Sequence, residues 1–307
     1  GWDSLLDPMI AAVHKCQNNS GPYCAAPVNI HRIDWMWANK AVFDNNGISV
    51  PTSWDELNAA AEKLQAAGII PFAHGGQAWQ DATVFEAVAM GIGGNNYYKN
   101  CYVDLKENCL RSDTTVKVFD QMRKLQGFTD EGSPGRDWNV ATGMVIEGKA
   151  GFQIMGDWAK GEFTAAGKVP GVDYYCAATP SNNGYLYNVD SFIFYKTSDP
   201  DKQEGQKLLA KLMMGKNFQK VFNLYKGSIP ARLDVPMDEF DKCAKTSNAD
   251  IKTAGAKGGL VPSFAHGMAQ GNTMKAALQD VITEHFNSDM SSIDAANALA
   301  DSVLDNM

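Results

Sequence analysis

The chain has 307 residues, of which 45% are hydrophobic, and carries a formal net charge of −8 at pH 7. A chain of this length and composition buries a sizeable core and is not disordered. The negative charge argues against nucleic acid or an anionic membrane as a partner, because both are bound mainly through surplus Lys and Arg. No apolar run approaches the roughly 20 residues needed to cross a bilayer. The first residues do not form a signal peptide, so we expect any export signal to lie upstream.

Apolar strand-like runs alternate with amphipathic helical patterns, which favours α/β architecture. The first helix with a clear beginning follows Thr52 and Ser53. Either residue can cap the helix, and Glu56 completes the capping box. Its apolar residues recur at helical spacing until Gly68 ends it. A short buried strand over residues 69–73 follows, and then a polar loop over residues 74–81. Ligands of open α/β sheets collect at loops beyond the carboxyl ends of strands, so this loop is a candidate binding segment.

A second strand is predicted over residues 150–155, followed by a Gly-Asp-Trp turn and a helical pattern. A third is predicted over residues 185–195, with Asn188 and Asp190 on one side because their spacing is two. Polar side chains at these positions would be awkward in a core. Two further helical regions are predicted as structural cover, at residues 200–214 and from Thr273 onward.

The six cysteines allow fifteen pairings, which local spacing narrows. Cys16–Cys24 and Cys101–Cys109 could each close a short loop, which leaves Cys176–Cys243 as a third pair. Three disulfides indicate an oxidising compartment, the periplasm, whereas the alternative is six buried thiols in a cytosolic protein. No CxxC or paired Cys/His spacing suggests zinc. The sequence therefore predicts no metal and no cofactor.

Several aromatic and polar side chains lie in glycine-containing loop segments. Glycine lets the backbone approach a ligand closely, and a tryptophan face beside charged hydrogen-bonding groups suits the apolar faces and hydroxyl rims of a sugar ring. This repertoire is typical of a carbohydrate-binding protein. The residues concerned are Trp79, Trp138, Trp158, Asp190, Lys226 and His266. Trp35, Trp37 and Trp54 instead lie in periodic apolar segments and are predicted to pack in the core.

The chain resembles the glucose/mannose-type solute-binding proteins that deliver sugars to bacterial ABC transporters. The match starts near Gly1-Trp2-Asp3 and continues through five segments in order. They are AAPVNIH at 25–31, PTSWDEL at 51–57, HGGQAWQD at 74–81, MVIEGKAGFQIMGDWAKGEF at 144–163 and KGSIPAR at 226–232. The resemblance implies a periplasmic, monomeric α/β protein with the type II periplasmic-binding-protein-like fold of two lobes. It also implies that the lobes close on a small-molecule sugar. The implied partners are the permease subunits of an ABC transporter, through which alone the protein contacts the inner membrane. The resemblance also supports the third disulfide, Cys176–Cys243.

The resemblance also implies a set of sugar-contacting residues. Each has an ordinary structural alternative when seen singly: a tryptophan packs in a core, a strand carboxylate is satisfied by neighbours, and a lysine faces solvent. His31 is as well explained by a satisfied core histidine as by a ligand contact. The predicted sugar-binding residues are Trp138, Trp158, Asn188, Asp190, Lys226, His266 and His31.

Family members carry roughly a hundred residues before the position where this chain begins. By analogy, residues 28–185 and 228–307 build lobe two, while residues 1–27 and 186–227 are a remnant of lobe one, with the sugar cleft between the lobes. We therefore expect lobe one to be incomplete here and this chain to bind glucose weakly or not at all.

Three alternatives remain open at this stage. The ligand could be glucose, mannose, galactose or an oligosaccharide, and the protein could serve a chemoreceptor rather than transport. A glycoside hydrolase would need two carboxylates, for which Asp157 and Glu162 near Trp158 are the candidates. No GxSxG elbow, HExxH helix or phosphate-binding loop accompanies them, and acidic residues near helix starts commonly complement the helix dipole. The sequence thus favours a binding protein over an enzyme.

Overall fold

The computed structural model describes residues 1–16, 20–180 and 184–307. The chain divides into two compact units, with unit 1 comprising residues 1–31 and 189–248 and unit 2 comprising residues 32–188 and 249–307. The lobe boundaries predicted after residues 27 and 185 lie a few residues from the unit boundaries after residues 31 and 188. The lobe boundary predicted after residue 227 lies inside unit 1, which extends to residue 248. The assignment of each unit to a lobe stays a prediction.

A mixed four-stranded sheet in the order β4-β5-β3-β6 forms one part of unit 2. β4 (Ile70–Phe72) runs parallel to β5 (Ala150–Ile154), while β3 (Trp35–Asn39) is antiparallel to β5 and to β6 (Tyr174–Ala178). Four of the five residues of β3 are buried, as an inner strand requires. The predictions that Trp35, Trp37 and Trp54 pack in the core are confirmed, since all three are buried.

A second sheet has the order β2-β7-β9, in which β7 (Tyr185–Asn188) and β9 (Leu260–Pro262) are parallel. β2 (His31–Arg32) lies at the boundary between the two units. The loops that follow β7 and β9 both carry predicted sugar-binding residues, which is the strand-end placement expected for ligand loops in α/β proteins.

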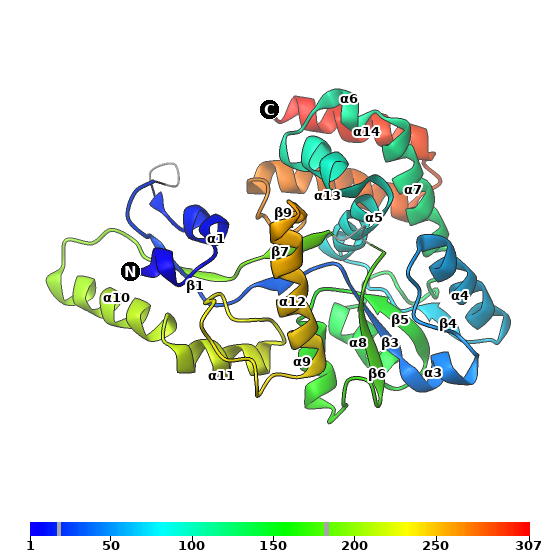
Figure 1. Cartoon of the computed structure of the whole chain (residues 1–307). Coiled ribbons are helices and arrows are strands. Elements are labelled where there is room, and N and C mark those ends of the chain that lie inside the picture. The colour runs from blue at the N-terminus through cyan, green and yellow to red at the C-terminus, as the bar shows by residue number, and fades with distance from the viewer. Residues whose placement is uncertain (17–19, 181–183) are drawn as a thin grey trace. The chain divides into compact units, whose positions relative to one another are not determined.

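Helices cover the rest of unit 2, and α5, α7, α13 and α14 pack against one another (Figure 1). No described helix combines the length and apolar character needed to span a membrane. The helices of this unit are α3 (Lys40–Asn45), α4 (Trp54–Ala66), α5 (Ala78–Tyr98), the π-helix η2 (Lys99–Val103), α6 (Glu107–Leu110), α7 (Asp113–Gln126), α8 (Trp138–Ile146), α9 (Ala159–Ala165), α13 (Asn272–Asn287) and α14 (Ser292–Asp305). The two C-terminal helices are those predicted from residue 273 onward.

Helix α4 begins and ends as its sequence predicts. The Ser53 side chain accepts a hydrogen bond from the Glu56 backbone N–H at 3.2 Å, and the Glu56 carboxylate accepts one from the Thr52 backbone N–H at 2.7 Å. The helix ends just before Gly68, which has a φ of +75°. The predicted strand follows as β4, so the local capping signals and the apolar periodicity placed both elements correctly.

Two predicted segments differ from the structure. The loop predicted over residues 74–81 is shorter, because α5 begins at Ala78. The single strand predicted over residues 185–195 is wrong: it splits into β7 and β8 (Ser191–Ile193), which belong to different sheets. The shared face predicted for Asn188 and Asp190 therefore does not exist, because the chain leaves the β2-β7-β9 sheet between the two strands.

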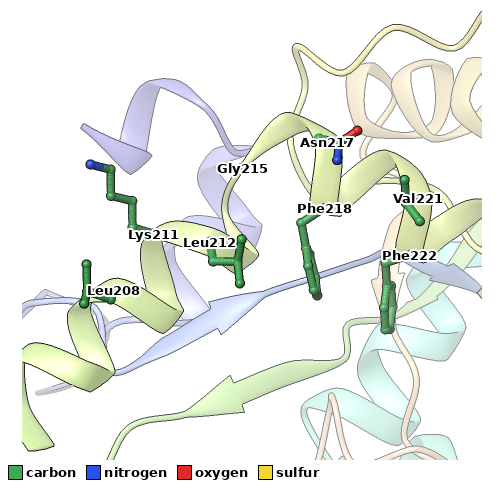
Figure 2. A pocket seen from close by; sticks show the side chains of 8 residues that line it. All are labelled: Leu208, Lys211, Leu212, Gly215, Asn217, Phe218, Val221 and Phe222. Carbon is green, nitrogen blue, oxygen red and sulfur yellow. The ribbon is translucent and has the colours of Figure 1, made fainter.

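Unit 1 contains the antiparallel pair β1 (Ala25–Pro27) and β8, the 3-10 helix η1 (Trp2–Ser4) and α1 (Pro8–Val13). The helix predicted over residues 200–214 is confirmed as α10 (Pro200–Met213), and α11 (Lys216–Lys226) follows it. These two helices line an apolar groove of about 710 Å³. Figure 2 shows Phe218 and Phe222 pointing the same way from α11. α12 (Lys242–Ala256) crosses from unit 1 into unit 2.

Two of the predicted disulfides are present. Cys16–Cys24 and Cys101–Cys109 each join residues eight apart in the sequence. No described cysteine is a free thiol. The alternative of six buried thiols is therefore excluded, while the pairing of Cys176 with Cys243 stays a prediction.

Candidate functional site

The turn between β5 and α9 places Trp158 at the surface of unit 2. Trp158 is half-buried, and its ring lies over the backbone of Gly156, where an added Cβ atom would come within 2.3 Å of the ring. Glycine is therefore required for this ring position, because real Cβ atoms do not approach that closely. The turn leaves part of the indole accessible.

Trp158 belongs to an aromatic cluster with Trp79 and His266. The centroids of Trp158 and His266 lie 5.0 Å apart, those of Trp79 and His266 6.0 Å apart, and those of the two tryptophans 6.3 Å apart. These separations are within the range of favourable aromatic contacts. Trp79 lies on the first turn of α5, and His266 follows β9. Three separate segments thus meet at this cluster, which is called the aromatic cluster below.

Thr83 fixes the His266 imidazole within the aromatic cluster. Its hydroxyl donates to the Trp79 backbone carbonyl at 2.7 Å, one helical turn away. The Thr83 oxygen also lies 3.0 Å from His266 Nε2, within hydrogen-bonding distance. The contact with Thr83 therefore fixes the orientation of the imidazole.

A polar cluster in unit 1 surrounds the Asp190 carboxylate. Asp190 Oδ2 accepts from Asn29 Nδ2 at 2.9 Å and lies 3.0 Å from His31 Nε2 and 3.5 Å from Lys226 Nζ. The Asn29 side-chain oxygen in turn accepts from the Asp190 backbone N–H at 2.8 Å. His31 is buried, whereas 39% of the Asp190 side chain and 41% of the Lys226 side chain are exposed. This Asp190 cluster therefore presents a carboxylate and an ammonium group to solvent.

The Asp190 carboxyl is ionised at neutral pH. Partial burial raises its pKa, but the hydrogen bonds from His31 and Asn29 and the charge of Lys226 outweigh burial, so the pKa lies well below its ordinary value. An ionised carboxylate accepts hydrogen bonds and the adjacent ammonium donates them. Charge-assisted bonds of this kind suit the hydroxyl groups of a neutral polar ligand.

The remaining predicted residues lie on other elements of unit 2. Trp138 is the first residue of α8, where its backbone carbonyl accepts from Thr142 Oγ1 at 3.0 Å and Gln153 Nε2 at 3.0 Å. Asn188 ends β7 and is half-buried. The structure thus brings five of the seven predicted residues into two clusters, namely Trp158 with His266 and Asp190 with Lys226 and His31.

Sequence reasoning missed Asn29 and Thr83 as parts of these clusters. Thr83 follows Trp79 by four residues, so the helical spacing of α5 could have paired them once the helix was known to begin at Ala78. Asn29 contacts a residue 161 positions away, and no local pattern indicates a contact of that range.

Of the two carboxylates considered for a hydrolase, Asp157 makes a contact within the fold. Asp157 is buried, and its Oδ2 accepts from the Arg32 backbone N–H at 3.0 Å. The hydrogen bond joins the turn after β5 to the backbone of Arg32, so Asp157 stabilises the fold at this place. Among the described residues, no group of His, Cys, Asp and Glu side chains is arranged to hold a metal ion.

A family profile described as bacterial extracellular solute-binding protein matches residues 2–213. The chain belongs to that family. Members of this solute-binding family are receptors and not enzymes, which removes the hydrolase alternative.

Similar proteins agree with this membership. A probable sugar-binding periplasmic protein of Brucella suis is 47% identical over 304 residues, covering 99% of this chain and 71% of the relative. One of Rhizobium meliloti is 44% identical, covering 99% of this chain and 72% of the relative. The solved structure of the bacterial solute receptor AcbH, described as exclusively preferring β-D-galactopyranose, has a TM-score of 0.81 at 18% identity and covers 99% of this chain and 78% of its own. The predicted type II periplasmic-binding-protein-like fold is confirmed.

Proposed function

We propose that this solute-binding protein binds a monosaccharide, with glucose as the first candidate and mannose or galactose as the next, and delivers it to an ABC import permease from the periplasm. The periplasmic, sugar-binding role rests on the relatives named above, and one further relative is an ABC transporter extracellular-binding protein of Pyrococcus horikoshii, 34% identical over 267 residues. The observation that carries the sugar assignment is the aromatic cluster of Trp79, Trp158 and His266. A sugar ring offers an apolar face to such a cluster.

The Asp190 cluster supplies the second half of the proposal. Its ionised carboxylate and the Lys226 ammonium would form hydrogen bonds with sugar hydroxyls. The hydrogen bonds with His31 and Asn29 hold the carboxylate in place. The two clusters belong to different units, so the proposal requires one sugar to contact both. A ligand that binds one arrangement of the units better than others would favour that arrangement, and we propose closure of the units on the sugar for this reason.

An oligosaccharide ligand is the second candidate. One protein of the same fold is described as a chitin oligosaccharide binding protein, with a TM-score of 0.76 at 17% identity. At that identity the likeness concerns the fold alone. The monosaccharide is preferred because the resemblance of the five ordered segments is to glucose/mannose-type binders.

The decisive experiment is isothermal titration of glucose, mannose, galactose, maltose and chitobiose into the gene-encoded, exported protein and into its Asp190→Asn variant. Asp234→Asn is the matched control, because Asp234 is also paired with basic side chains in unit 1, Arg232 at 2.8 Å and Lys216 at 3.0 Å. We expect saturable binding of one monosaccharide, weakened about ten- to a hundredfold in Asp190→Asn as a charge-assisted bond is lost, and unchanged in Asp234→Asn.

Other outcomes overturn defined parts of the proposal. Binding of the disaccharides alone would replace the monosaccharide with an oligosaccharide. Equal affinity of the Asp190→Asn protein and the unsubstituted protein would remove the Asp190 cluster from the site. An absence of binding to every sugar in the panel would contradict the function as a whole.

A further inference from the structure

The carboxylate of Glu86 on α5 is buried against the segment that carries His266. The Glu86 side chain is fully buried, and its Oε1 accepts from Ser263 Oγ at 2.6 Å. Its Oε2 accepts from Tyr98 Oη at 2.9 Å and from the backbone N–H groups of Phe264 at 3.1 Å and Ala265 at 3.4 Å. Three consecutive residues after β9 are therefore held by one side chain.

The bond to Ser263 extends to His266 itself. Ser263 Oγ accepts from the His266 backbone N–H at 3.1 Å while donating to Glu86. The Ser263 carbonyl accepts from Met268 N–H at 2.9 Å, which closes the segment on itself. We call residues 263–268 the histidine loop. Its shape depends on hydrogen bonds that converge on Ser263 and Glu86.

One face of α5 contacts both the histidine loop and its imidazole. Trp79, Thr83 and Glu86 are spaced by four and three residues, which places them along one side of the helix. Trp79 packs against the imidazole, Thr83 lies within hydrogen-bonding distance of it, and Glu86 accepts from backbone N–H groups of the histidine loop. The position of His266 relative to Trp79 is thus set by a single rigid element.

Packing alone does not explain a carboxylate at this place. Two of the residues that donate to it, Tyr98 and Phe264, belong to an aromatic group, in which the Phe264 ring lies 6.3 Å from that of Tyr98 and 5.2 Å from that of Tyr102. Burying a charge costs free energy, and apolar residues of similar volume often stabilise such positions as well or better. Four converging donors, by contrast, give the carboxylate a directional role that an apolar side chain does not have.

We propose that Glu86 is a positioning residue of the sugar site, which fixes the histidine loop and so places His266 against Trp79 and Trp158 for the ligand. Glu86 does not touch the sugar in this scheme. The inference rests on the proposed sugar-binding function, and it adds a residue that lies outside the predicted contact set.

The test compares Glu86→Gln, Ser263→Ala and the double variant with the unsubstituted exported protein. Sugar affinity is measured by calorimetry with the monosaccharide that binds best, and backbone protection by hydrogen exchange without sugar. We expect each single variant to lose about tenfold in affinity and to exchange faster at residues 264–266. Because both act through one contact, the double variant should lose little more than either single variant.

Asn58→Ala is the matched control. Asn58 and Gln121 form a buried reciprocal amide pair at 2.9 and 2.8 Å on α4 and α7, away from the histidine loop. Its loss destabilises unit 2 without touching the site, so we expect faster exchange around α4 and α7 and unchanged affinity. Unchanged affinity in Asn58→Ala would show that a loss of stability in unit 2 does not by itself weaken sugar binding. A loss of affinity in Glu86→Gln could then be assigned to misplacement of His266.

Three results would overturn the inference. Glu86→Gln could bind sugar as tightly as the unsubstituted protein, the histidine loop could keep its protection in that variant, or Asn58→Ala could lose as much affinity as Glu86→Gln. Failure of the proposed function is a distinct outcome, because the unsubstituted protein would then bind none of the sugars. In that case the proposed role of Glu86 in sugar binding is also wrong, whatever hydrogen exchange shows for the histidine loop.

Discussion

Two buried titratable residues of unit 2 have pKa values shifted in opposite directions. Burial raises the pKa of the Glu86 carboxyl to about 7, although four hydrogen bonds favour its ionised form. Burial and the nearby charge of Arg123 lower the pKa of the His285 imidazole to about 4. Neither ring nitrogen of His285 has a hydrogen-bond partner among the described residues. Burial therefore shifts each pKa in the direction that favours the neutral form of the residue.

These shifts predict opposing pH dependences of stability. The raised Glu86 pKa adds stability at acidic pH that is lost as pH rises from 4.5 through 7. The lowered His285 pKa adds stability at neutral pH that is lost as pH falls from 6.5 through 4. Each effect is worth roughly 2 kcal/mol between pH 7 and pH 5. In the unsubstituted protein the two nearly cancel.

We expect the cancellation to disappear when either residue is replaced. As pH falls from 7 to 5, His285→Leu should gain roughly 2 kcal/mol in free energy of unfolding relative to the unsubstituted protein, and Glu86→Gln should lose a similar amount. Urea unfolding at pH 5, 6 and 7 measures this. Comparing variants removes the contribution of the other titratable groups. Parallel pH profiles for the two variants would show that burial does not shift these pKa values as described.

Trp158, His266 and Glu86 were predictable to different degrees. Trp158 and His266 adjoin glycines in loop segments, and that local composition identified both. Glu86 lies within a continuous buried stretch of α5, where a single acid has no distinguishing pattern in the sequence. Its role depends on donors 177 to 179 positions away, which only the folded chain brings together.

At the scale of elements, local signals predicted helices well and sheet membership poorly. The capping residues of α4 and the apolar periodicity of α10, α13 and α14 are contained within each helix. The split between β7 and β8 has no such local signal, because alternation of side chains is the same whichever sheet a strand joins. The error moved Asn188 and Asp190 into a common strand that does not exist.

The β5–α9 connection yields a prediction about the position of Trp158. A methyl group at Gly156 would meet the far edge of the Trp158 ring, so Gly156→Ala should displace the ring and leave the backbone largely intact. We expect sugar affinity to fall about tenfold, as an aromatic contact worth about 1 kcal/mol or more is lost, with a changed tryptophan emission spectrum and less than about 1 kcal/mol loss of stability.

Gly143→Ala is the control for this substitution. Gly143 lies within α8, and an added Cβ there meets no other atom within 4 Å. Alanine in a helix interior stabilises by about 0.5–1 kcal/mol, so affinity and emission should stay unchanged. If Gly156→Ala binds sugar as tightly as Gly143→Ala does, the ring position of Trp158 is not needed for binding.

At the scale of the whole molecule, the family and the fold were predictable because the ordered segments span most of the chain. The groove on α10 and α11 was not predicted. Its apolar lining offers few hydrogen-bonding groups to sugar hydroxyls, which separates it from the clusters of the proposed site. Leu208 and Leu212 on this face are 59% and 61% exposed, which is unusual for leucines that recur at helical spacing.

This exposed face predicts binding of a hydrophobic dye by the 307-residue chain. We expect anilinonaphthalene sulfonate to fluoresce strongly with this chain and several-fold less with the Leu212→Lys, Val221→Lys double variant, because both side chains line the groove. The matched control is Leu304→Lys, Ile293→Lys on α14, which replaces two equally exposed apolar residues that do not line this groove with the same charges. If the two pairs lower the dye signal equally, net charge and not the groove determines binding. If the groove variant leaves the signal unchanged, the dye binds elsewhere and the helical face of α10 and α11 is not a continuous apolar surface in solution.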